Sequence, residues 1–422
     1  MTFKKKIDRL NCVGKSLIAI EEVDEKYHIA TLILGCKYSP VGDYELDNSE
    51  SVFDYLDEER QKGFTNEELY LLAKGFISKT ARTTGTPLHG HFELTPLCNL
   101  NCKMCYVHLN DSQLAGKQLL SAETWIDLMQ QAIDAGMTSV NLSGGECLTY
   151  PYFDDVFLFL KQKGVDVFIL TNGVLLNEER ITFFKKNCPQ MIQISLYGNS
   201  EEAYERVTGK RVFSTVLNSI IAAKDAGLPI KLAITPNSFM SDTIKDTIQL
   251  AKDLDVFYTL TLSLLTPRTD TGRSKGDADI SLDEYIDIFT YNRILNGNVP
   301  IPQELDPIKE GRECECSSSG VKCGAGRNGF SIRWDGRMHP CSQMDSIAVD
   351  PVKLGFQAAW EIINREVNSF PRFKKCDNCD YSDACLFCAA ENEKMGSRYS
   401  LNPEWCERTV RMIKSGLKKP KA

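Results

Sequence analysis

The sequence predicts an α/β protein whose centre is a partial (β/α)6 TIM-like barrel, with a small α+β domain before it and a cysteine-rich domain after it. Between residues 89 and 263, short apolar runs alternate with segments of helical periodicity, as in a parallel sheet covered by helices. Six such runs are too few to close an eight-stranded barrel. The chain of 422 residues, 42% hydrophobic and 25% charged, is long enough for two or three globular domains.

The individual strands and helices of the barrel follow from the length and spacing of these runs. We expect strands at 90–95, 138–143, 166–171, 191–197, 230–235 and 259–263. Helices are expected near 121–135, 152–163, 177–187, 212–226 and 242–254. Ligands of such sheets bind at the carboxyl ends of the strands, so residues that directly follow a strand are the first candidates for a functional site.

Residues 1–85 are predicted to form a separate small domain. Apolar runs at 15–20 and 28–34, joined by an acidic turn, predict a β-hairpin. Two helical patterns follow at 51–60 and 65–77, and the second begins with a capping-box sequence.

The other domain boundaries follow from changes in composition. A Thr- and Gly-rich stretch at 80–87 predicts a linker, and the barrel domain is expected at 88–300. Residues 310–410 are rich in Gly and Cys, and we expect bound metal to stabilise them in place of a large apolar core. Residues 411–422 predict a solvated basic tail.

Charge and cysteine content narrow the class of protein. A net charge of −8 argues against a general nucleic-acid binder. The basic N-terminus has no apolar segment behind it, and no run of 18 apolar residues occurs, so we expect a cytoplasmic protein with no membrane partner. In that compartment, 16 cysteines are more readily metal ligands than disulfides.

The most informative motif is a cysteine triplet after the first barrel strand. Cys98, Cys102 and Cys105 have the spacing to hold an iron–sulfur cluster by three irons and to leave one iron open. The same spacing would place three small buried side chains on one face of a helix. Pro96 and Asn99 favour a loop instead, and a loop can wrap a cluster.

Together with Gly144-Gly145-Glu146 after the second strand, this triplet resembles the radical S-adenosylmethionine (SAM) enzymes over roughly residues 88–270. The resemblance implies a [4Fe-4S] cluster on the three cysteines and SAM on the open iron. It also implies an enzyme that cleaves SAM reductively to a 5′-deoxyadenosyl radical, which abstracts hydrogen from a substrate.

Six residues are expected to contact SAM under this resemblance. Gly144 and Gly145 would let the backbone approach the methionine part, and the Glu146 carboxylate would pair with its ammonium group. Ser195 ends a strand at the same edge, Arg206 would meet the SAM carboxylate, and Tyr106 would stack on the adenine. A strand-end hydroxyl and a solvated helix arginine are the alternatives for Ser195 and Arg206, and residues 171–173 predict an ordinary turn.

The C-terminal cysteines resemble the SPASM extension, which carries two auxiliary [4Fe-4S] clusters. Matching the pattern position by position implies one cluster on Cys316, Cys323, Cys341 and Cys388, and another on Cys376, Cys379, Cys385 and Cys406. Cys314 competes with Cys316 for the first. Structural zinc sites are the alternative for Cys-x2-Cys pairs.

Proteins similar to both halves modify peptides or protein side chains. The expected function is therefore a peptide maturase that forms a thioether, C–C or ether crosslink in a ribosomally synthesised precursor with a leader sequence, supplied with electrons by a flavodoxin or ferredoxin. The N-terminal hairpin loosely resembles winged domains that bind leader peptides by strand addition, with a capping subdomain as the alternative.

Two other functions stay open at this point. An anaerobic sulfatase maturase, which oxidises Cys or Ser to formylglycine, typically has an aspartate where Ser342 stands, although Asp345 lies nearby. A non-catalytic iron–sulfur or zinc protein would use every cysteine structurally.

Overall fold

The computed structural model describes most of the chain from residue 84 onward. The described residues are 19–23, 26–30, 62–63, 78, 81–82, 84–261, 264–268, 271, 276–302, 320–377, 379, 381–396 and 398–418. The helices expected at 51–60 and 65–77 lie outside them, as do Cys314 and Cys316.

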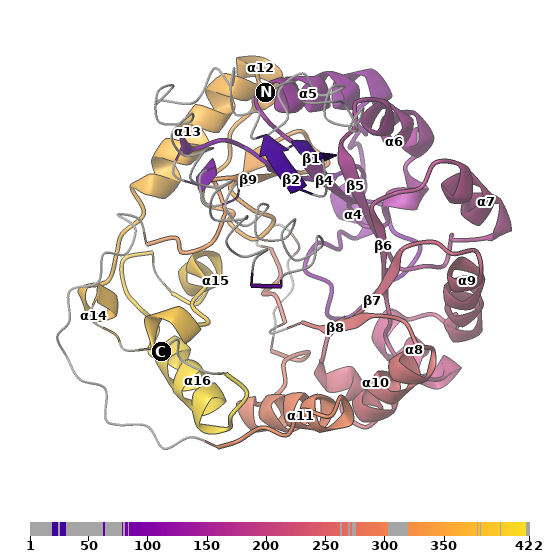
Figure 1. The fold of residues 1–422 in the computed structure, drawn as a ribbon, viewed down its shortest axis with the longest axis vertical. Coiled ribbons are helices and arrows are strands. Elements are labelled where there is room, and N and C mark those ends of the chain that lie inside the picture. The colour runs from indigo at the N-terminus through magenta and orange to yellow at the C-terminus, as the bar shows by residue number, and fades with distance from the viewer. Residues whose placement is uncertain are drawn as a thin grey trace.

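The centre of the fold is a curved eight-stranded sheet in the order β10-β9-β3-β4-β5-β6-β7-β8 (Figure 1). The six strands β3 to β8 are parallel neighbours, which confirms the partial six-stranded barrel. Their bounds agree with the expected runs: β3 His89–Glu93, β4 Ser139–Ser143, β5 Asp166–Thr171, β6 Met191–Ser195, β7 Ile230–Ile234 and β8 Tyr258–Leu260.

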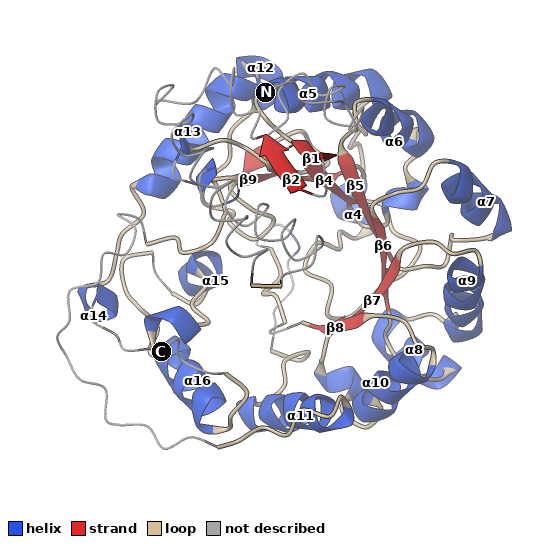
Figure 2. Cartoon of the chain, viewed as in Figure 1, coloured by secondary structure: helices blue, strands red, loops and turns tan. Residues whose placement is uncertain are grey.

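Helices cover the convex side of this sheet (Figure 2). The five expected helices are present as α5 Ala122–Asp134, α6 Phe153–Gln162, α7 Glu178–Lys186, α9 Phe213–Asp225 and α10 Ile244–Asp253. The structure adds α4 Asp111–Leu114, α8 Glu201–Thr208 and α11 Leu282–Leu295. Among the described residues, no helix is both long enough and apolar enough to cross a bilayer.

Side-chain alternation along the strands separates a tight core from a looser concave face. Val167 and Ile169 of β5 and Ile192 of β6 point toward the helices and are 0% exposed. Phe168 and Gln193, which point the other way, are only half-buried. The apolar core therefore lies between sheet and helices, and the concave face is left for ligands.

The C-terminal part of the chain joins the same sheet. Strand β9 (Gly329–Ile332) pairs in parallel with β3, and β10 (Met338–His339) pairs antiparallel with β9. The ring of Phe330 lies 5.7 Å from that of Phe92 in β3 and 4.9 Å from that of Phe356, the first residue of α13 (Phe356–Asn368). This segment therefore shares the barrel core, which corrects the expectation that metal replaces a core throughout residues 310–410.

Four short or terminal helices complete the described part of the C-terminal region: α12 Pro351–Leu354, α14 Lys374–Asp377, α15 Ala389–Lys394 and α16 Glu404–Lys414. The solvated tail expected from residue 411 is wrong for its described part. Met412 and Ile413 of α16 are 1% and 0% exposed, and Leu417 packs with Met412 and Tyr285. The apolar residues recur at helical spacing, so this basic stretch has a buried face.

The expected N-terminal hairpin is present in the described residues. Strand β1 (Ala19–Val23) pairs antiparallel with β2 (Lys26–Ala30), so the acidic residues Glu21 and Glu22 lie in a strand and not in the turn. The segment expected as a linker is packed at its end, because Thr86 is 5% exposed and the Trp360 indole donates a hydrogen bond of 2.6 Å to the Gly85 carbonyl.

Candidate functional site

The cysteine triplet lies in a loop at the carboxyl end of β3, as the sequence predicts. Two backbone hydrogen bonds hold this loop against the end of α8, from Asn101 N to Thr208 O and from Lys103 N to Val207 O, each 2.9 Å. A third, from Cys105 N to Cys102 O at 3.1 Å, forms a turn. The segment is therefore ordered by the barrel and not by helix formation.

Cys98 and Cys105 are close enough to interact electrostatically, and Tyr197 interacts with all three thiols. The pKa of Cys98 is raised to about 12, mainly by burial and in smaller part by Glu146 and Cys105, while the Leu100 N–H, which donates to Sγ at 3.4 Å, lowers it. Burial also raises the pKa of Tyr197, and all three cysteines add to that shift.

The donor set fits an iron–sulfur cluster. Buried thiols become thiolates when a cation compensates their charge, and iron supplies that cation. Among the described residues, no three His, Cys, Asp or Glu side chains lie close enough together to hold a single metal ion. A four-iron cluster instead takes its cysteine ligands on separate irons.

Gly144 and Gly145 lie directly against the cysteine loop. Gly145 N donates to Thr95 O, and Glu146 N donates to Leu97 O, both at 2.8 Å. A Cβ on Gly144 would come within 2.4 Å of Thr95 O, and one on Gly145 within 2.4 Å of Leu97 O. Glycine is thus required at both positions by the close contact with the backbone of the cysteine loop, whether or not SAM also approaches there.

The Glu146 carboxylate is buried and bonded within the protein. It is 1% exposed and accepts hydrogen bonds from Leu148 N (3.1 Å), Thr171 Oγ1 (2.8 Å) and Asn172 N (2.7 Å). Burial raises its pKa, and these donors lower it in part. The direct pairing of Glu146 with an ammonium group stays a prediction, and in this structure its carboxylate ties the end of β4 to the end of β5.

Asn172 is a site residue that sequence reasoning missed, since residues 171–173 predicted only a turn. Its Nδ2 donates to Asn99 Oδ1 at 2.7 Å and to Cys98 Sγ at 3.8 Å. The side chain therefore links the end of β5 to the first cysteine. Its position immediately after a strand was the available signal.

Ser195 is placed with the cysteines, as expected. It ends β6 on the concave face, and its side chain hydrogen-bonds to Tyr197, whose pKa all three cysteines influence. Tyr197 is the second residue missed by sequence reasoning, although it too follows a strand.

Arg206 and Tyr106 are not placed as expected. The Arg206 guanidinium forms a bidentate ion pair with Asp242, at 2.7 and 2.9 Å, and the two side chains are 45% and 61% exposed. The Tyr106 ring packs against the Arg268 guanidinium, whose Cζ lies 5.4 Å from the ring centroid. Arg206 is thus a surface residue, and a cation already covers a face of Tyr106 that adenine would need.

The described C-terminal cysteines fall into two groups. The pKa of Cys341 is raised to about 12, mainly by burial and in smaller part by Cys323 and Cys388. Burial also raises the pKa of Cys376, with additional contributions from Cys385, Cys406 and Cys379. The grouping is the one that the sequence pattern implies, apart from Cys316 and Cys314, which lie outside the described residues.

Comparisons with known proteins agree with this geometry. The model of the radical SAM superfamily matches residues 92–254, which include the cysteine loop, Gly144-Gly145-Glu146 and strands β4 to β7. The AdoMet-dependent heme synthase of Methanosarcina barkeri is 25% identical over 343 residues, which cover 76% of this chain and 97% of that protein. The sporulation killing factor maturation protein SkfB of Bacillus subtilis is 25% identical over 278 residues, which cover 64% of this chain and 65% of SkfB.

Solved structures show the same fold. The structure of Streptococcus suis SuiB bound to precursor peptide SuiA superposes with a TM-score of 0.61 at 17% identity, over 86% of this chain and 90% of SuiB. The family match, the cysteine loop and the partial barrel lead to one assignment. Residues 92–254 of this chain form a radical SAM domain, of a family whose members bind a [4Fe-4S] cluster and SAM.

Proposed function

We propose that this enzyme is a peptide maturase that forms a crosslink in a ribosomally synthesised precursor. The observation that carries the proposal is the contact between the cysteine loop and Gly144-Gly145, which brings the family's two motifs to one strand edge. Two relatives support a peptide as the substrate class: SkfB, named for maturation of a killing factor, and the antilisterial bacteriocin subtilosin biosynthesis protein AlbA of Bacillus subtilis, which is 26% identical over 196 residues.

In this proposal Cys98, Cys102 and Cys105 ligate the SAM-binding cluster. When bound, the cluster and SAM supply a 5′-deoxyadenosyl radical that removes hydrogen from the peptide. Asn172 and Glu146 orient the cysteine loop and the end of β4, and their buried hydrogen bonds keep both segments in one arrangement. The backbone of Gly144-Gly145, the Glu146 carboxylate and the Ser195 hydroxyl are the proposed contacts with SAM that lie at this edge of the sheet.

The two C-terminal cysteine groups are proposed to hold two auxiliary clusters. Cys323, Cys341 and Cys388 would bind one of them, with Cys316 or Cys314 as the fourth ligand. The other would be bound by Cys376, Cys379, Cys385 and Cys406. The mutual effects on the thiol pKa values support this division.

Formylglycine formation is not favoured by the surroundings of Ser342. Asp345, the carboxylate that could replace the missing base, forms ion pairs with Arg333 and Lys394. These two contacts occupy both oxygens of the carboxylate that a base at this position would use. The alignment with the AdoMet-dependent heme synthase covers 97% of that protein. A small-molecule substrate is therefore the alternative that the tests below distinguish from a peptide.

The proposed partners are a precursor peptide and a low-potential electron donor such as flavodoxin or ferredoxin. The hairpin of β1 and β2, which form a two-stranded sheet among the described residues, is a candidate for leader binding, since a strand edge can pair with an extended peptide. A cytoplasmic location is proposed because the clusters need a reducing compartment.

Anaerobic reconstitution tests the cofactor assignment. We expect about twelve irons per chain and dithionite-dependent formation of 5′-deoxyadenosine from SAM. Replacing Cys98, Cys102 and Cys105 together with alanine should abolish this cleavage and leave about eight irons bound. Cys188→Ala is the matched control, because Cys188 is exposed and belongs to none of the three groups. Cleavage that persists in the triple variant, or zinc in place of iron, would rule the assignment out.

Mass spectrometry tests the substrate class. A short peptide encoded beside this chain, co-expressed with it, should lose a pair of hydrogen atoms for each crosslink formed. An unchanged peptide mass with unchanged chirality, in cells where SAM cleavage is intact, would reject the maturase proposal while leaving the radical SAM assignment in place.

A further inference from the structure

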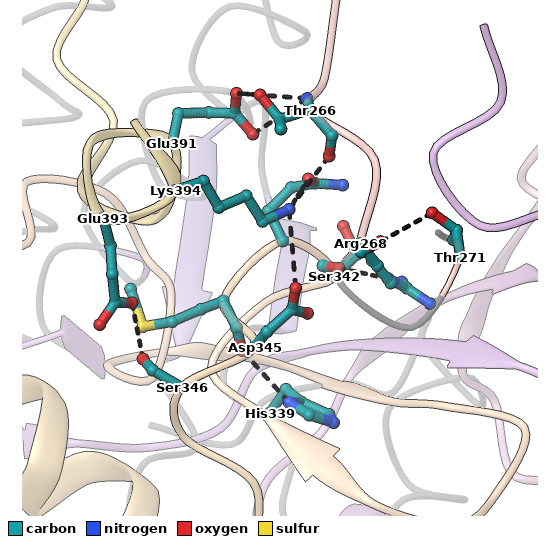
Figure 3. Close-up of polar contacts among 12 residues, drawn as sticks. Thr266, Arg268, Thr271, His339, Ser342, Asp345, Ser346, Glu391, Glu393 and Lys394 are labelled. Carbon is teal, nitrogen blue, oxygen red and sulfur yellow. Dashed lines mark hydrogen bonds and ion pairs between the residues drawn. The ribbon is translucent and has the colours of Figure 1, made fainter. Parts of the chain in front are cut away.

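The loop that follows the last barrel strand joins three parts of the molecule. Residues 264–268, called the bridge loop below, follow β8 and make hydrogen bonds both to Tyr106, next to the cysteine loop, and to Ser342 of the C-terminal domain. Figure 3 shows Thr266 and Arg268 of this loop beside their C-terminal partners. Arg268 at its end is 3% exposed. A buried guanidinium is tolerated only where its charge and donors are matched, so each of its partners is informative.

The first partner of Arg268 is Glu93, the last residue of β3. Arg268 Nη1 donates to Glu93 Oε2 at 2.8 Å, and Nη2 donates to Glu93 Oε1, so the pair is bidentate. Burial raises the pKa of Glu93, but Arg268, with smaller contributions from His91 and Arg333, outweighs burial, and the net pKa lies below the ordinary value. The pair is therefore charged and fixes the guanidinium plane relative to β3.

The second partner is Tyr106, the residue after Cys105. Arg268 N donates to Tyr106 O at 3.1 Å, and the guanidinium lies against the Tyr106 ring. The backbone and the side chain of Arg268 thus both contact the end of the first cysteine loop. A lysine would keep the charge but lose the flat group that stacks on the ring.

The third partner is the segment after Cys341. Arg268 Nε donates to Ser342 O at 2.9 Å, so the same guanidinium that binds Glu93 also holds the residue next to an auxiliary ligand. Because the guanidinium is planar and rigid, these contacts are made together only when the three segments keep one relative position.

A second residue of the bridge loop contacts the helix that follows Cys388, another cysteine of the same group. Thr266 donates to Glu391 from its N (3.2 Å) and its Oγ1 (2.6 Å), and its carbonyl accepts from Lys394 Nζ at 3.1 Å. Glu391 and Lys394 belong to α15, which follows Cys388 directly. Figure 3 shows these side chains pointing from α15 toward Thr266.

We propose that Arg268 is a positioning residue that fixes the separation of the SAM-binding cysteine loop from the Cys341 segment. It acts through Tyr106 on one side and Ser342 on the other, with Glu93 holding the guanidinium in place. The inference rests on the proposed function, because it concerns the distance between the SAM-site cluster and the auxiliary cluster of Cys323, Cys341 and Cys388.

Two variants and a control test this role. Arg268→Lys keeps the charge for Glu93 but cannot make the forked pair and reach Ser342 O together. Should that variant fail to fold, the double variant Glu93→Leu with Arg268→Met removes both charges and leaves no unpaired ion. Arg411→Gln is the matched control, since Arg411 also joins the C-terminal domain to the barrel, through Asp283, but at the surface.

The measurements use the anaerobic, iron-loaded protein. Backbone amides of residues 101–106 and 341–346 should exchange with solvent at least about tenfold faster in the Arg268 variants than in wild type or Arg411→Gln. In the reduced protein, electron paramagnetic resonance should show weaker spin coupling between the SAM-site cluster and its auxiliary neighbour. Total iron should be unchanged.

The outcomes separate this inference from the proposed function. Exchange and spin coupling equal to wild type in the Arg268 variants, or faster exchange confined to β3, would overturn the positioning role. A wild-type protein that binds no iron would overturn the proposed function, and the exchange rates would still report whether Arg268 holds the two segments together.

Discussion

Replacing the two site glycines with alanine gives the sharpest test of how the cysteine loop is held. Gly144 has a φ of +145°, and an added Cβ would lie 2.4 Å from Thr95 O. Gly145 has the same clash, with Leu97 O, without a φ in the left-handed range. Two other glycines serve as controls. Gly227 has a φ of +71° but open space around it, and Gly276 has neither a positive φ nor a clash.

The expected changes in the free energy of unfolding follow from the positive φ and from the clash of the added Cβ. A non-glycine residue at such a φ costs about 1–3 kcal/mol, and forcing a methyl group into backbone costs about 1–3 kcal/mol. Gly144→Ala should therefore lose about 2–6 kcal/mol and Gly145→Ala about 1–3 kcal/mol. Gly227→Ala should lose about 1–2 kcal/mol, and Gly276→Ala should gain up to about 1 kcal/mol through a less flexible unfolded chain.

Thermal unfolding followed by circular dichroism checks this order. A loss of about 4 kcal/mol lowers the melting temperature of a cooperative unit of 422 residues by roughly 5 °C. Since the clashing atoms belong to the cysteine loop, Gly144→Ala and Gly145→Ala should also lose iron from the SAM site, and Gly227→Ala should not. The reasoning is refuted if Gly144→Ala melts no lower than Gly227→Ala.

Three further predictions concern charge and metal. The pKa of Glu93 is lower in the folded protein than its unfolded value of 4.5. Its ion pair with Arg268 therefore stabilises the fold at pH values above 4.5, and this stabilisation is lost as the pH falls through the folded pKa. Acid titration of Glu93→Gln, followed by circular dichroism, should therefore be shallower below about pH 4.5, and an equally steep curve would contradict this. Arg206→Ala should change the free energy of unfolding by less than about 1 kcal/mol and leave SAM binding in equilibrium dialysis unchanged. A large loss of SAM affinity would show that Arg206 contacts SAM. Cys406→Ala should lose about four irons and retain the spectrum of the SAM-site cluster, and loss of all iron would show that the groups are not independent.

The barrel could be predicted from the sequence because each strand and helix carries its own pattern. Val167 and Ile169 alternate with less buried residues, and the runs are short and evenly spaced, so strand positions follow from local sequence. The cysteine loop was predictable for the same reason, since Pro96 and Asn99 lie within it.

The surroundings of the site were not predictable, because they depend on contacts between distant segments. The hydrogen bonds of Asn172 and Glu146 form only when β4 and β5 lie side by side. Arg268 stands in a loop with no motif, and its importance comes from Glu93, Tyr106 and Ser342, which lie in three other parts of the chain. Arg206 was misplaced because a helical arginine near a motif is as readily a surface ion pair.

The pairing of β9 with β3 sets the order in which this molecule can assemble. The first partner of His89 in the sheet, Ser139, is about 50 residues away, and the second, Gly329, is about 240 residues away. The longer closure costs only about 1.4 kcal/mol more in chain entropy. During synthesis at about 5–20 residues per second, however, one edge of β3 stays unpaired for about 12 to 48 s before β9 is made. Throughout that time the nascent barrel exposes an open strand edge beside its three unligated cysteines, so protection of the emerging chain and delivery of iron fall within the same interval.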